Sequence, residues 1–113
     1  GQKRPLYELV ARRIQTWNEF GNCGLVVGAT YPQELSTIRA ICPTMPILIP
    51  GVGAQGGDLE ASVKAGVDAH GERAILAVSR SVLYAGSGSD FADMAAAEAR
   101  MLRNRMNEAR RFI

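Results

Sequence analysis

A run of glycines in the middle of the chain has the spacing of a phosphate-binding loop. Gly51, Gly53 and Gly56 match the pattern G-x-G-x-x-G, and Gln55 lies among them as an amide donor. Glycines let backbone N–H groups approach an anion closely, because they lack a Cβ and readily adopt a positive φ. The pattern alone leaves three interpretations open: a tight structural turn, a dinucleotide-binding loop, and a phosphate cradle after a parallel strand.

The position of the next helix separates the two binding interpretations. In a dinucleotide-binding fold the helix begins inside the glycine motif, so its N-terminus faces the pyrophosphate. Here Asp58 is placed to cap a helix only after the last glycine, and its carboxylate would repel a pyrophosphate. The acidic residue expected after the following strand is missing, because Ser79 and Arg80 stand there. An arginine that binds the extra phosphate of NADP nevertheless keeps the dinucleotide alternative open.

Arg80 is the second candidate for binding an anion. It follows an apolar segment at residues 74–78, so we expect it at the carboxyl end of a strand. A guanidinium can bind a phosphate with two parallel hydrogen bonds, and nearby backbone N–H groups can add more. The strand end with Arg80 and the one with Gln55 would then converge on one anion, as after strands 7 and 8 of (β/α)₈ barrels. The structural alternatives are a surface ion pair for Arg80 and solvated loop polarity for Gln55.

The elements that position these loops alternate between helix and strand. Apolar runs at residues 24–28, 47–49 and 74–78 predict three strands, and such runs are typical of parallel strands buried on both faces. Periodicity and breakers predict helices at residues 6–20, 30–42, 59–65 and 90–111. The alternation predicts a parallel sheet with right-handed crossovers. Three strands leave two bare edges, so we expect part of a larger α/β structure or completion by association.

Local signals indicate where these helices begin and end. Thr30 and Gln33 have the spacing of a capping box at the start of the second helix. Asp58 and Asp90 are predicted N-caps, and Gly66 is predicted to follow the end of the third helix. These boundaries place the glycine loop and Arg80 between elements, where loops carry binding groups.

The remaining chemistry-bearing side chains give weaker signals. His70, the single histidine, falls in a loop at the opposite end of the predicted sheet, which speaks against a catalytic role. Cys23 and Cys42 show no CxxC spacing and no paired histidine, so a disulfide scaffold or a zinc site is not predicted and a reducing cytoplasm fits. Packing is expected for five further side chains, namely Tyr31, Tyr84, Met94, Met101 and Met106.

Composition excludes several classes of protein. The 113 residues are 47% hydrophobic and 21% charged, which is typical of a folded domain or a piece of one. Thirteen Lys and Arg against eleven Asp and Glu leave a net charge of +2, too small to predict a nucleic-acid partner. The apolar runs are shorter than the roughly 18 residues of a membrane span, and no signal peptide is visible, so no membrane partner is expected.

Three segments together carry a family signature. They are GLVVGAT at residues 24–30, PGVGAQGGD at residues 50–58 and SRS at residues 79–81. In these segments the chain resembles the C-terminal half of the orotidine 5′-phosphate decarboxylases, most of all their longer bacterial branch. The resemblance implies that residues 1–113 are a single, incomplete domain: strands 6–8, with their helices, of a (β/α)₈ TIM barrel.

The resemblance also implies an activity and a binding site. The activity is the decarboxylation of orotidine 5′-monophosphate to UMP in pyrimidine synthesis, without metal or cofactor, by a cytoplasmic enzyme that is a homodimer when intact. Pro50 and Gly51 take positions beside the pyrimidine. The family's phosphate-binding positions are taken here by Gln55, Arg80, Ser79 and Gly53.

The catalytic group of that family is absent from the sequence. The family uses interleaved Lys and Asp residues with the motif Asp-x-Lys-x-x-Asp, whereas Lys3 and Lys64 lie outside any Asp-x-Lys pattern. No residue of this chain is therefore expected to be catalytic, and the isolated chain is expected to be inactive. Its N-terminal half-barrel would be a missing partner. The alternatives are a non-catalytic phosphate-binding half-barrel and an NADP-binding fragment of an oxidoreductase.

Overall fold

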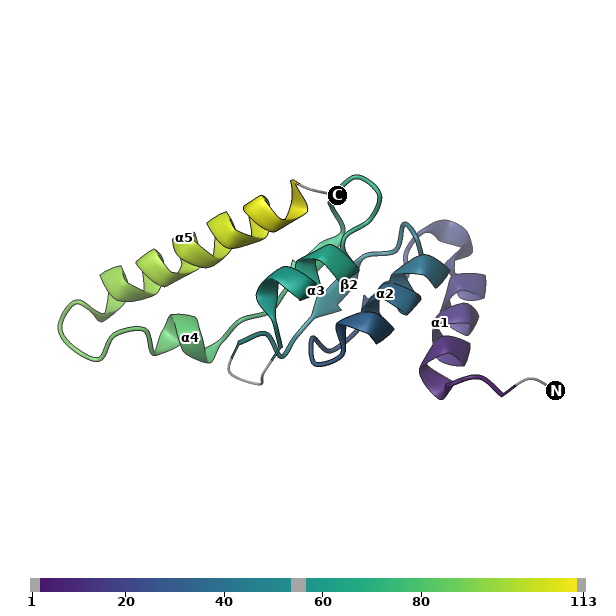
Figure 1. Ribbon diagram of the computed structural model, residues 1–113, viewed down its shortest axis with the longest axis horizontal. Helices are drawn as coiled ribbons and strands as arrows, with labels where there is room; N and C mark the ends of the chain where they lie inside the picture. Colours follow the sequence, from purple (N-terminus) through teal and green to yellow (C-terminus); the bar gives the residue numbers. More distant parts are fainter. Residues whose placement is uncertain (1–2, 54–56, 112–113) are drawn as a thin grey trace.

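Helices and strands alternate along the chain in the structure, a computed structural model that describes residues 3–53 and 57–111 (Figure 1). The helices are α1 (Leu6–Trp17), α2 (Pro32–Ile41), α3 (Leu59–Gly66), α4 (Arg80–Leu83) and α5 (Phe91–Arg110), and a 3₁₀ turn at Asn18–Phe20 follows α1. The strands are β1 (Leu25–Val26), β2 (Ile47–Ile49) and β3 (Ala74–Leu76). Helix α4 is not among the predicted elements, because four residues are too few to show helical periodicity.

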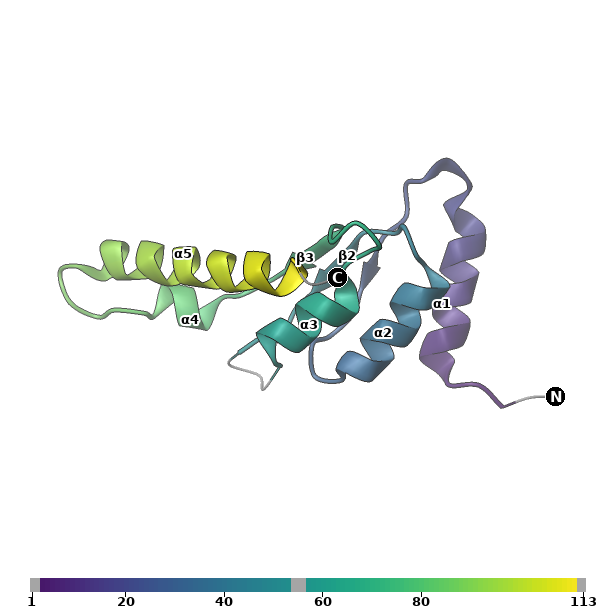
Figure 2. The same ribbon diagram turned by 45° about the horizontal axis from the view of Figure 1, so that its top comes forward.

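The strands form one parallel sheet in the order β1-β2-β3. Each strand therefore pairs with the next one along the chain, and helices α2 and α3 cover the same side of the sheet (Figures 1 and 2). Right-handed crossovers that always step to the next strand produce this one-sided cover, as in (β/α)₈ barrels. A dinucleotide-binding fold instead reverses the strand order and covers both faces. The α/β prediction is thus confirmed, and the winding favours a barrel segment.

One face of the sheet is buried and the other is bare. Ile47 and Ile49 are completely buried under the helices. Val26, Leu48 and Ile75, which lie side by side in the parallel register, point the other way and are 70%, 37% and 58% exposed. The prediction of burial on both faces is therefore wrong for these residues of the isolated chain. A barrel interior is filled by side chains from all of its strands, and three strands supply only part of them.

The core between the sheet and the helices depends on close packing of α3. Leu35, Met45 and the β2 isoleucines are among its fully buried side chains. Gly66 ends α3 and lies so near the sheet that a Cβ there would be 2.5 Å from Cδ1 of Ile49. Val67 then takes an extended conformation. Gly66 is therefore inside the helix and serves close packing, which corrects its prediction as the residue after the helix end.

The predicted helix starts have different outcomes. Asp58 caps α3, since its Oδ1 accepts a hydrogen bond of 2.9 Å from the N–H of Ala61. Asp90 stands at the N-cap of α5 but makes no side-chain capping bond. The predicted capping box of Thr30 and Gln33 is wrong, because Tyr31 is the N-cap and makes no side-chain capping bond. Proline suits the first position of a helix, and Pro32 begins α2 there, which moves Gln33 out of register for the box.

Some side chains expected to pack are instead exposed. Tyr31 and Tyr84 are largely exposed, and Met94 and Met101 are each more than 40% exposed on α5. Met106 does pack against the core. Both cysteines are free thiols, with Cys42 buried and Cys23 half-buried, so no disulfide forms. His70 lies in the loop after α3, as predicted, and is exposed.

The molecule is elongated, with principal extents of 59 × 26 × 25 Å. Figure 2 shows the reason: α4 and the first half of α5 form an arm that extends beyond the sheet. Within the described residues, no helix is long and apolar enough to cross a bilayer. A domain of this length is ordinarily more compact, with a radius of gyration of about 13 Å for 100 residues. The 15.8 Å found here reflects the projecting arm.

Candidate functional site

Two successive strand ends meet around one small hollow, which we call the strand-end hollow. Its volume is about 130 Å³. The β2 side contributes Pro50, Gly51 and Val52, and the β3 side contributes the stretch from Ala77 to Ser81. Four of the predicted site residues therefore lie together, namely Pro50, Gly51, Ser79 and Arg80. The parallel arrangement causes this convergence, because the carboxyl ends of neighbouring strands lie at the same edge of a sheet.

The glycine loop after β2 is a closed turn. Gly51 and Gly53 have φ values of 89° and 78°, a conformation that glycine adopts without strain. The N–H of Gly53 donates to the Gly57 carbonyl (2.9 Å), and the N–H of Gly57 donates to the Gly51 carbonyl (3.1 Å). A Cβ at Gly57 would lie only 2.6 Å from Cβ of Ala29. The turn thus needs Gly51, Gly53 and Gly57 for structural reasons, which agrees in part with the tight-turn interpretation.

The remaining two predicted phosphate-binding residues lie elsewhere. Gly53 does not line the strand-end hollow, and its N–H is already used inside the turn. Gln55 lies outside the described residues. The geometry therefore assigns the Gly53 N–H to its hydrogen bond with the Gly57 carbonyl, so Gly53 is not a free N–H donor.

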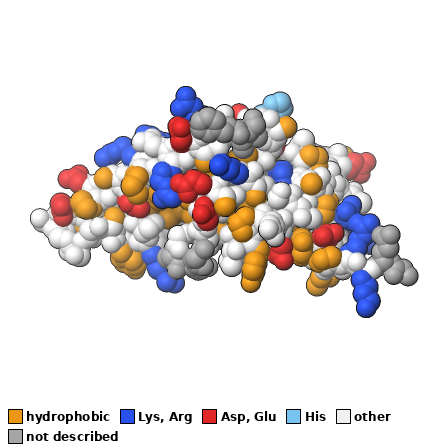
Figure 3. Space-filling view, viewed as in Figure 1, with side chains coloured by type: hydrophobic (Ala, Val, Ile, Leu, Met, Phe, Trp, Pro, Cys, Tyr) orange, Lys and Arg blue, Asp and Glu red, His pale blue; other side chains and the backbone are white. Residues whose placement is uncertain are grey.

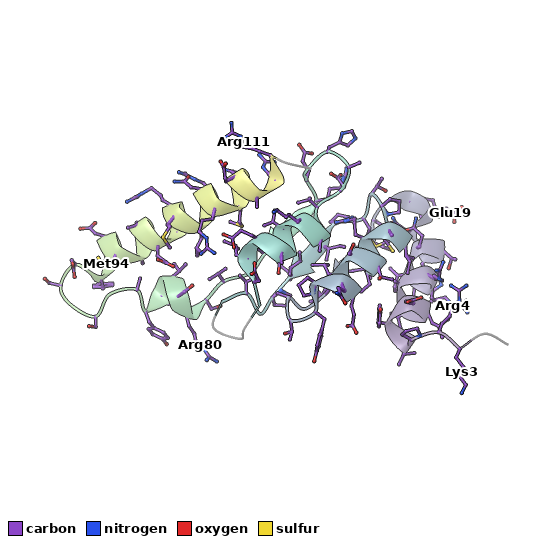
Figure 4. The ribbon with its side chains drawn as sticks, in the orientation of Figure 1. Lys3, Arg4, Glu19, Arg80, Met94 and Arg111 are labelled. Atoms are coloured by element: carbon purple, nitrogen blue, oxygen red, sulfur yellow. The ribbon has the colours of Figure 1, made fainter. Side chains whose placement is uncertain are left out.

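Arg80 is the first residue of α4 and is exposed. Its side chain points away from the ribbon (Figure 4). Among the described residues, no carboxylate or carbonyl accepts a hydrogen bond from its guanidinium, in contrast to the predicted surface alternative of an ion pair. Across the same part of the chain, the N–H groups of Ser79 and Arg80 donate to no backbone carbonyl. This strand end therefore offers one guanidinium and two N–H groups to an anion.

A second hollow of about 230 Å³ lies directly beside the glycine loop, between α3 and α5. Gly53, Gly57 and Ser81 line it, together with an ion pair between Glu60 and Arg105. Arg105 donates from Nε to Oε1 of Glu60 (2.7 Å) and from Nη2 to Oε2 (2.9 Å). These hydrogen bonds lower the pKa of Glu60 and raise that of Arg105, so both groups are charged at neutral pH. Figure 3 shows acidic and basic side chains side by side on this face.

Arg39 is a structural residue that the sequence analysis missed. It lies on α2 and is only 8% exposed. Its Nε donates to the carbonyl of Gly66 (2.7 Å) and its Nη2 to that of Arg73 (3.0 Å). Its Nη1 donates to the carbonyls of Cys42 (3.0 Å) and Met45 (2.6 Å). The signal for its burial was its position four residues after Leu35, on the apolar face of the helix.

The loop that holds His70 is built around a carboxylate. Oδ1 of Asp68 accepts hydrogen bonds from the N–H groups of His70 (2.9 Å) and Glu72 (3.0 Å). The N–H of Glu72, followed by that of His70, holds the pKa of Asp68 below its ordinary value. The His70 backbone thus serves a turn at the amino ends of the strands. In the described part of the chain, no group of His, Cys, Asp and Glu side chains is arranged to hold a metal ion.

Sequence comparison gives a consistent set of relatives. No protein-family model matches the chain. An orotidine 5′-phosphate decarboxylase of Dehalococcoides mccartyi is 52% identical over 111 residues, which is 98% of this chain and 41% of that protein. The enzyme of the same name from Azoarcus sp. is 54% identical over 106 residues, or 93% of this chain and 39% of that protein. The chain thus spans about two fifths of the length of the curated relatives it matches.

Solved structures agree with the sequence relatives. The structure of Leishmania donovani OMP decarboxylase matches 97% of this chain with a TM-score of 0.79 and 41% identity, over 40% of its own length. The UMP synthase of the same organism matches 97% of this chain with a TM-score of 0.81 and 44% identity, over 23% of its length. Sequence and fold together therefore confirm the resemblance of this chain to the orotidine 5′-phosphate decarboxylases over nearly its whole length.

Proposed function

We propose that this chain is the phosphate-binding, C-terminal part of an orotidine 5′-phosphate decarboxylase, a cytoplasmic enzyme that converts orotidine 5′-monophosphate to UMP. The proposal is carried by one observation. The strand-end hollow joins two of the segments that resemble the family, and the Arg80 guanidinium beside it has no partner among the described residues. In this proposal the chain is a single incomplete domain that supplies strands 6–8 of the barrel.

Each predicted site residue then has a physical role. Arg80 binds the phosphate dianion with charge-assisted hydrogen bonds, and the Ser79 N–H adds to them. Gln55 donates from its side-chain amide, and Gly53 shapes the turn that carries it. Pro50 and Gly51 follow β2 directly and line the same hollow, so the pyrimidine would lie beside them. The phosphate does not take part in the reaction and lies away from the reacting carbon. Its binding energy can nevertheless be used to orient the substrate and so to stabilise the transition state.

The chemistry at C6 of the pyrimidine requires groups from elsewhere in the protein. The Lys and Asp residues of the family motif would place a carboxylate against the substrate carboxylate and an ammonium where carbanion character develops. This chain has no Asp-x-Lys sequence. Its share of catalysis is therefore to hold and orient the phosphate end of the substrate.

The bare surfaces of the chain indicate where the remainder of the barrel would dock. Val26, Leu48 and Ile75 would line the closed interior, and the free edges of β1 and β3 would pair with further strands. A groove of about 470 Å³ between α1 and β1 is lined by apolar side chains, including Leu6 and Val10. We propose that an N-terminal half-barrel covers these surfaces, and that the intact enzyme is a homodimer.

The direct test joins this chain to the part of the Dehalococcoides mccartyi relative that it does not match; we call the product the completed barrel. Release of CO₂ from orotidine 5′-monophosphate is then measured for the completed barrel and for this chain alone. We expect turnover by the completed barrel and none by the chain alone, because the family's Lys and Asp set lies in the added part. A folded completed barrel that binds UMP without turnover would instead support a non-catalytic phosphate-binding function.

A further inference from the structure

The ion pair between Glu60 and Arg105 connects two elements that are far apart in the sequence. The two residues are 45 positions apart, and both oxygens of one carboxylate receive hydrogen bonds from one guanidinium. Each side chain is a little less than half exposed, at 45% for Arg105 and 43% for Glu60. Exposed ion pairs ordinarily contribute little to stability, but bidentate geometry is the exception that fixes a relative orientation.

The location of this pair relates it to the glycine loop. Glu60 lies in the first turn of α3, three residues after Gly57, whose N–H and carbonyl close the loop. Arg105 lies on α5, so its ion pair with Glu60 connects the first turn of α3 to α5. The ion pair lines the second hollow, between α3 and α5, and Ser81, the neighbour of Arg80, lines it too. Both strand ends of the site therefore border this hollow.

From this geometry we propose that Glu60 and Arg105 are positioning residues for phosphate binding, which hold the glycine loop in register with the Arg80 segment. The inference rests on the proposed function, because it assigns the pair a task in the same site. Neither residue contacts the phosphate in this proposal. They act through the start of α3 and the two hydrogen bonds between Gly51, Gly53 and Gly57.

Substituting Glu60 separates this role from a simple effect of charge. The hollow also contains Asp58 and Glu98, so carboxylates are in excess beside the proposed phosphate site. If the pair acted only through charge, Glu60→Gln would remove a negative charge and strengthen the binding of an anion. If it acts by positioning, Glu60→Gln weakens binding because the bidentate contact is lost. The two accounts therefore predict opposite signs.

The experiment measures UMP affinity and the exchange of the Gly53 and Gly57 amide hydrogens in the completed barrel. For Glu60→Gln and for Arg105→Ala we expect about a two- to fivefold rise in Kd, the range for an exposed ion pair. We also expect faster exchange at both glycines. The charge-swapped double variant Glu60→Arg/Arg105→Glu should recover part of both effects. Arg111→Ala is the matched control, since Arg111, the C-cap of α5, pairs with Glu108 of that helix and lies far from Arg80 (Figure 4).

The outcomes distinguish failure of the inference from failure of the proposed function. Loss of UMP binding in Arg80→Ala, together with unchanged or tighter binding and unchanged exchange in Glu60→Gln, would overturn the positioning role and leave the function standing. Equal UMP affinity of Arg80→Ala and the unsubstituted completed barrel would overturn the phosphate site itself. If Arg105→Ala unfolds, Glu60→Gln and the double variant still show whether UMP affinity falls or rises when the ion pair is changed. An effect of Arg111→Ala as large as that of Arg105→Ala would also contradict the inference.

Discussion

The two ends of the sheet use arginine in opposite ways. At the amino ends of the strands, Arg39 is buried and its guanidinium donates four hydrogen bonds to backbone carbonyls. At the carboxyl ends, Arg80 is exposed and makes no ion pair with any described residue. A guanidinium that donates four of its five N–H groups to backbone carbonyls stabilises the fold, whereas a guanidinium with free donors is available to a ligand. The difference indicates that one edge is built for stability and the other for binding.

The largest expected effect is on stability and comes from the amino edge. Arg39→Ala removes four hydrogen bonds to backbone carbonyls together with a buried side chain, so we expect the free energy of unfolding to fall by about 3–5 kcal/mol. Urea unfolding of the completed barrel measures the loss. Arg39→Lys should lose less, because an ammonium keeps the charge and has three donors in place of the guanidinium's planar array. A change below about 1 kcal/mol for Arg39→Ala would contradict a structural role.

At the carboxyl edge, Arg80→Ala should affect ligand binding strongly and stability hardly at all. Removing the guanidinium should weaken UMP binding by about 2–4 kcal/mol, since it eliminates charge-assisted hydrogen bonds to a dianion. The free energy of unfolding should change by less than about 0.5 kcal/mol, because the side chain is exposed and contacts no partner in the described part of the chain. Calorimetric titration and urea unfolding give the two values. A variant that loses stability but retains affinity would reverse our assignment of this edge.

The two predicted N-caps, Asp58 and Asp90, give a further comparison with smaller expected effects on stability. Asp58 begins the helix after the glycine loop and makes its capping bond, so Asp58→Ala should cost about 1 kcal/mol of stability. Asp90 makes no side-chain capping bond, so Asp90→Ala should cost less than about half of that. Thermal or urea unfolding of both variants tests the difference. Equal losses would mean that the capping bond of Asp58 adds nothing to stability.

Sequence reasoning succeeded where the determinants are local. The three strands, the four longer helices and the Asp58 cap follow from apolar runs and residue types within a few positions, whereas the four-residue α4 was not predicted. The strand-end hollow was also predictable in outline, because parallel strands bring their carboxyl ends together and both loops had recognisable residues. The predicted capping box failed for a local reason as well, since Pro32 fixes where α2 begins.

The features that were missed depend on residues distant in the sequence. The carbonyls that accept hydrogen bonds from Arg39 lie up to 34 positions away in the sequence, and the ion pair of Glu60 with Arg105 joins residues 45 positions apart. No local pattern encodes such partners. The bare face of the sheet has another cause: uniformly apolar strands predict burial on two faces, and this chain by itself covers only one of them.

The central claim is that the Arg80 edge binds the phosphate, and a truncated substrate tests it most directly. The completed barrel and its Arg80→Ala variant are assayed with orotidine 5′-monophosphate and with orotidine, which lacks the phosphate. We expect kcat/KM for the full substrate to fall by roughly 30- to 1,000-fold, which corresponds to about 2–4 kcal/mol. The rate with orotidine should hardly change. An equal loss with both substrates would contradict the account, because Arg80 would then act on something other than the phosphate.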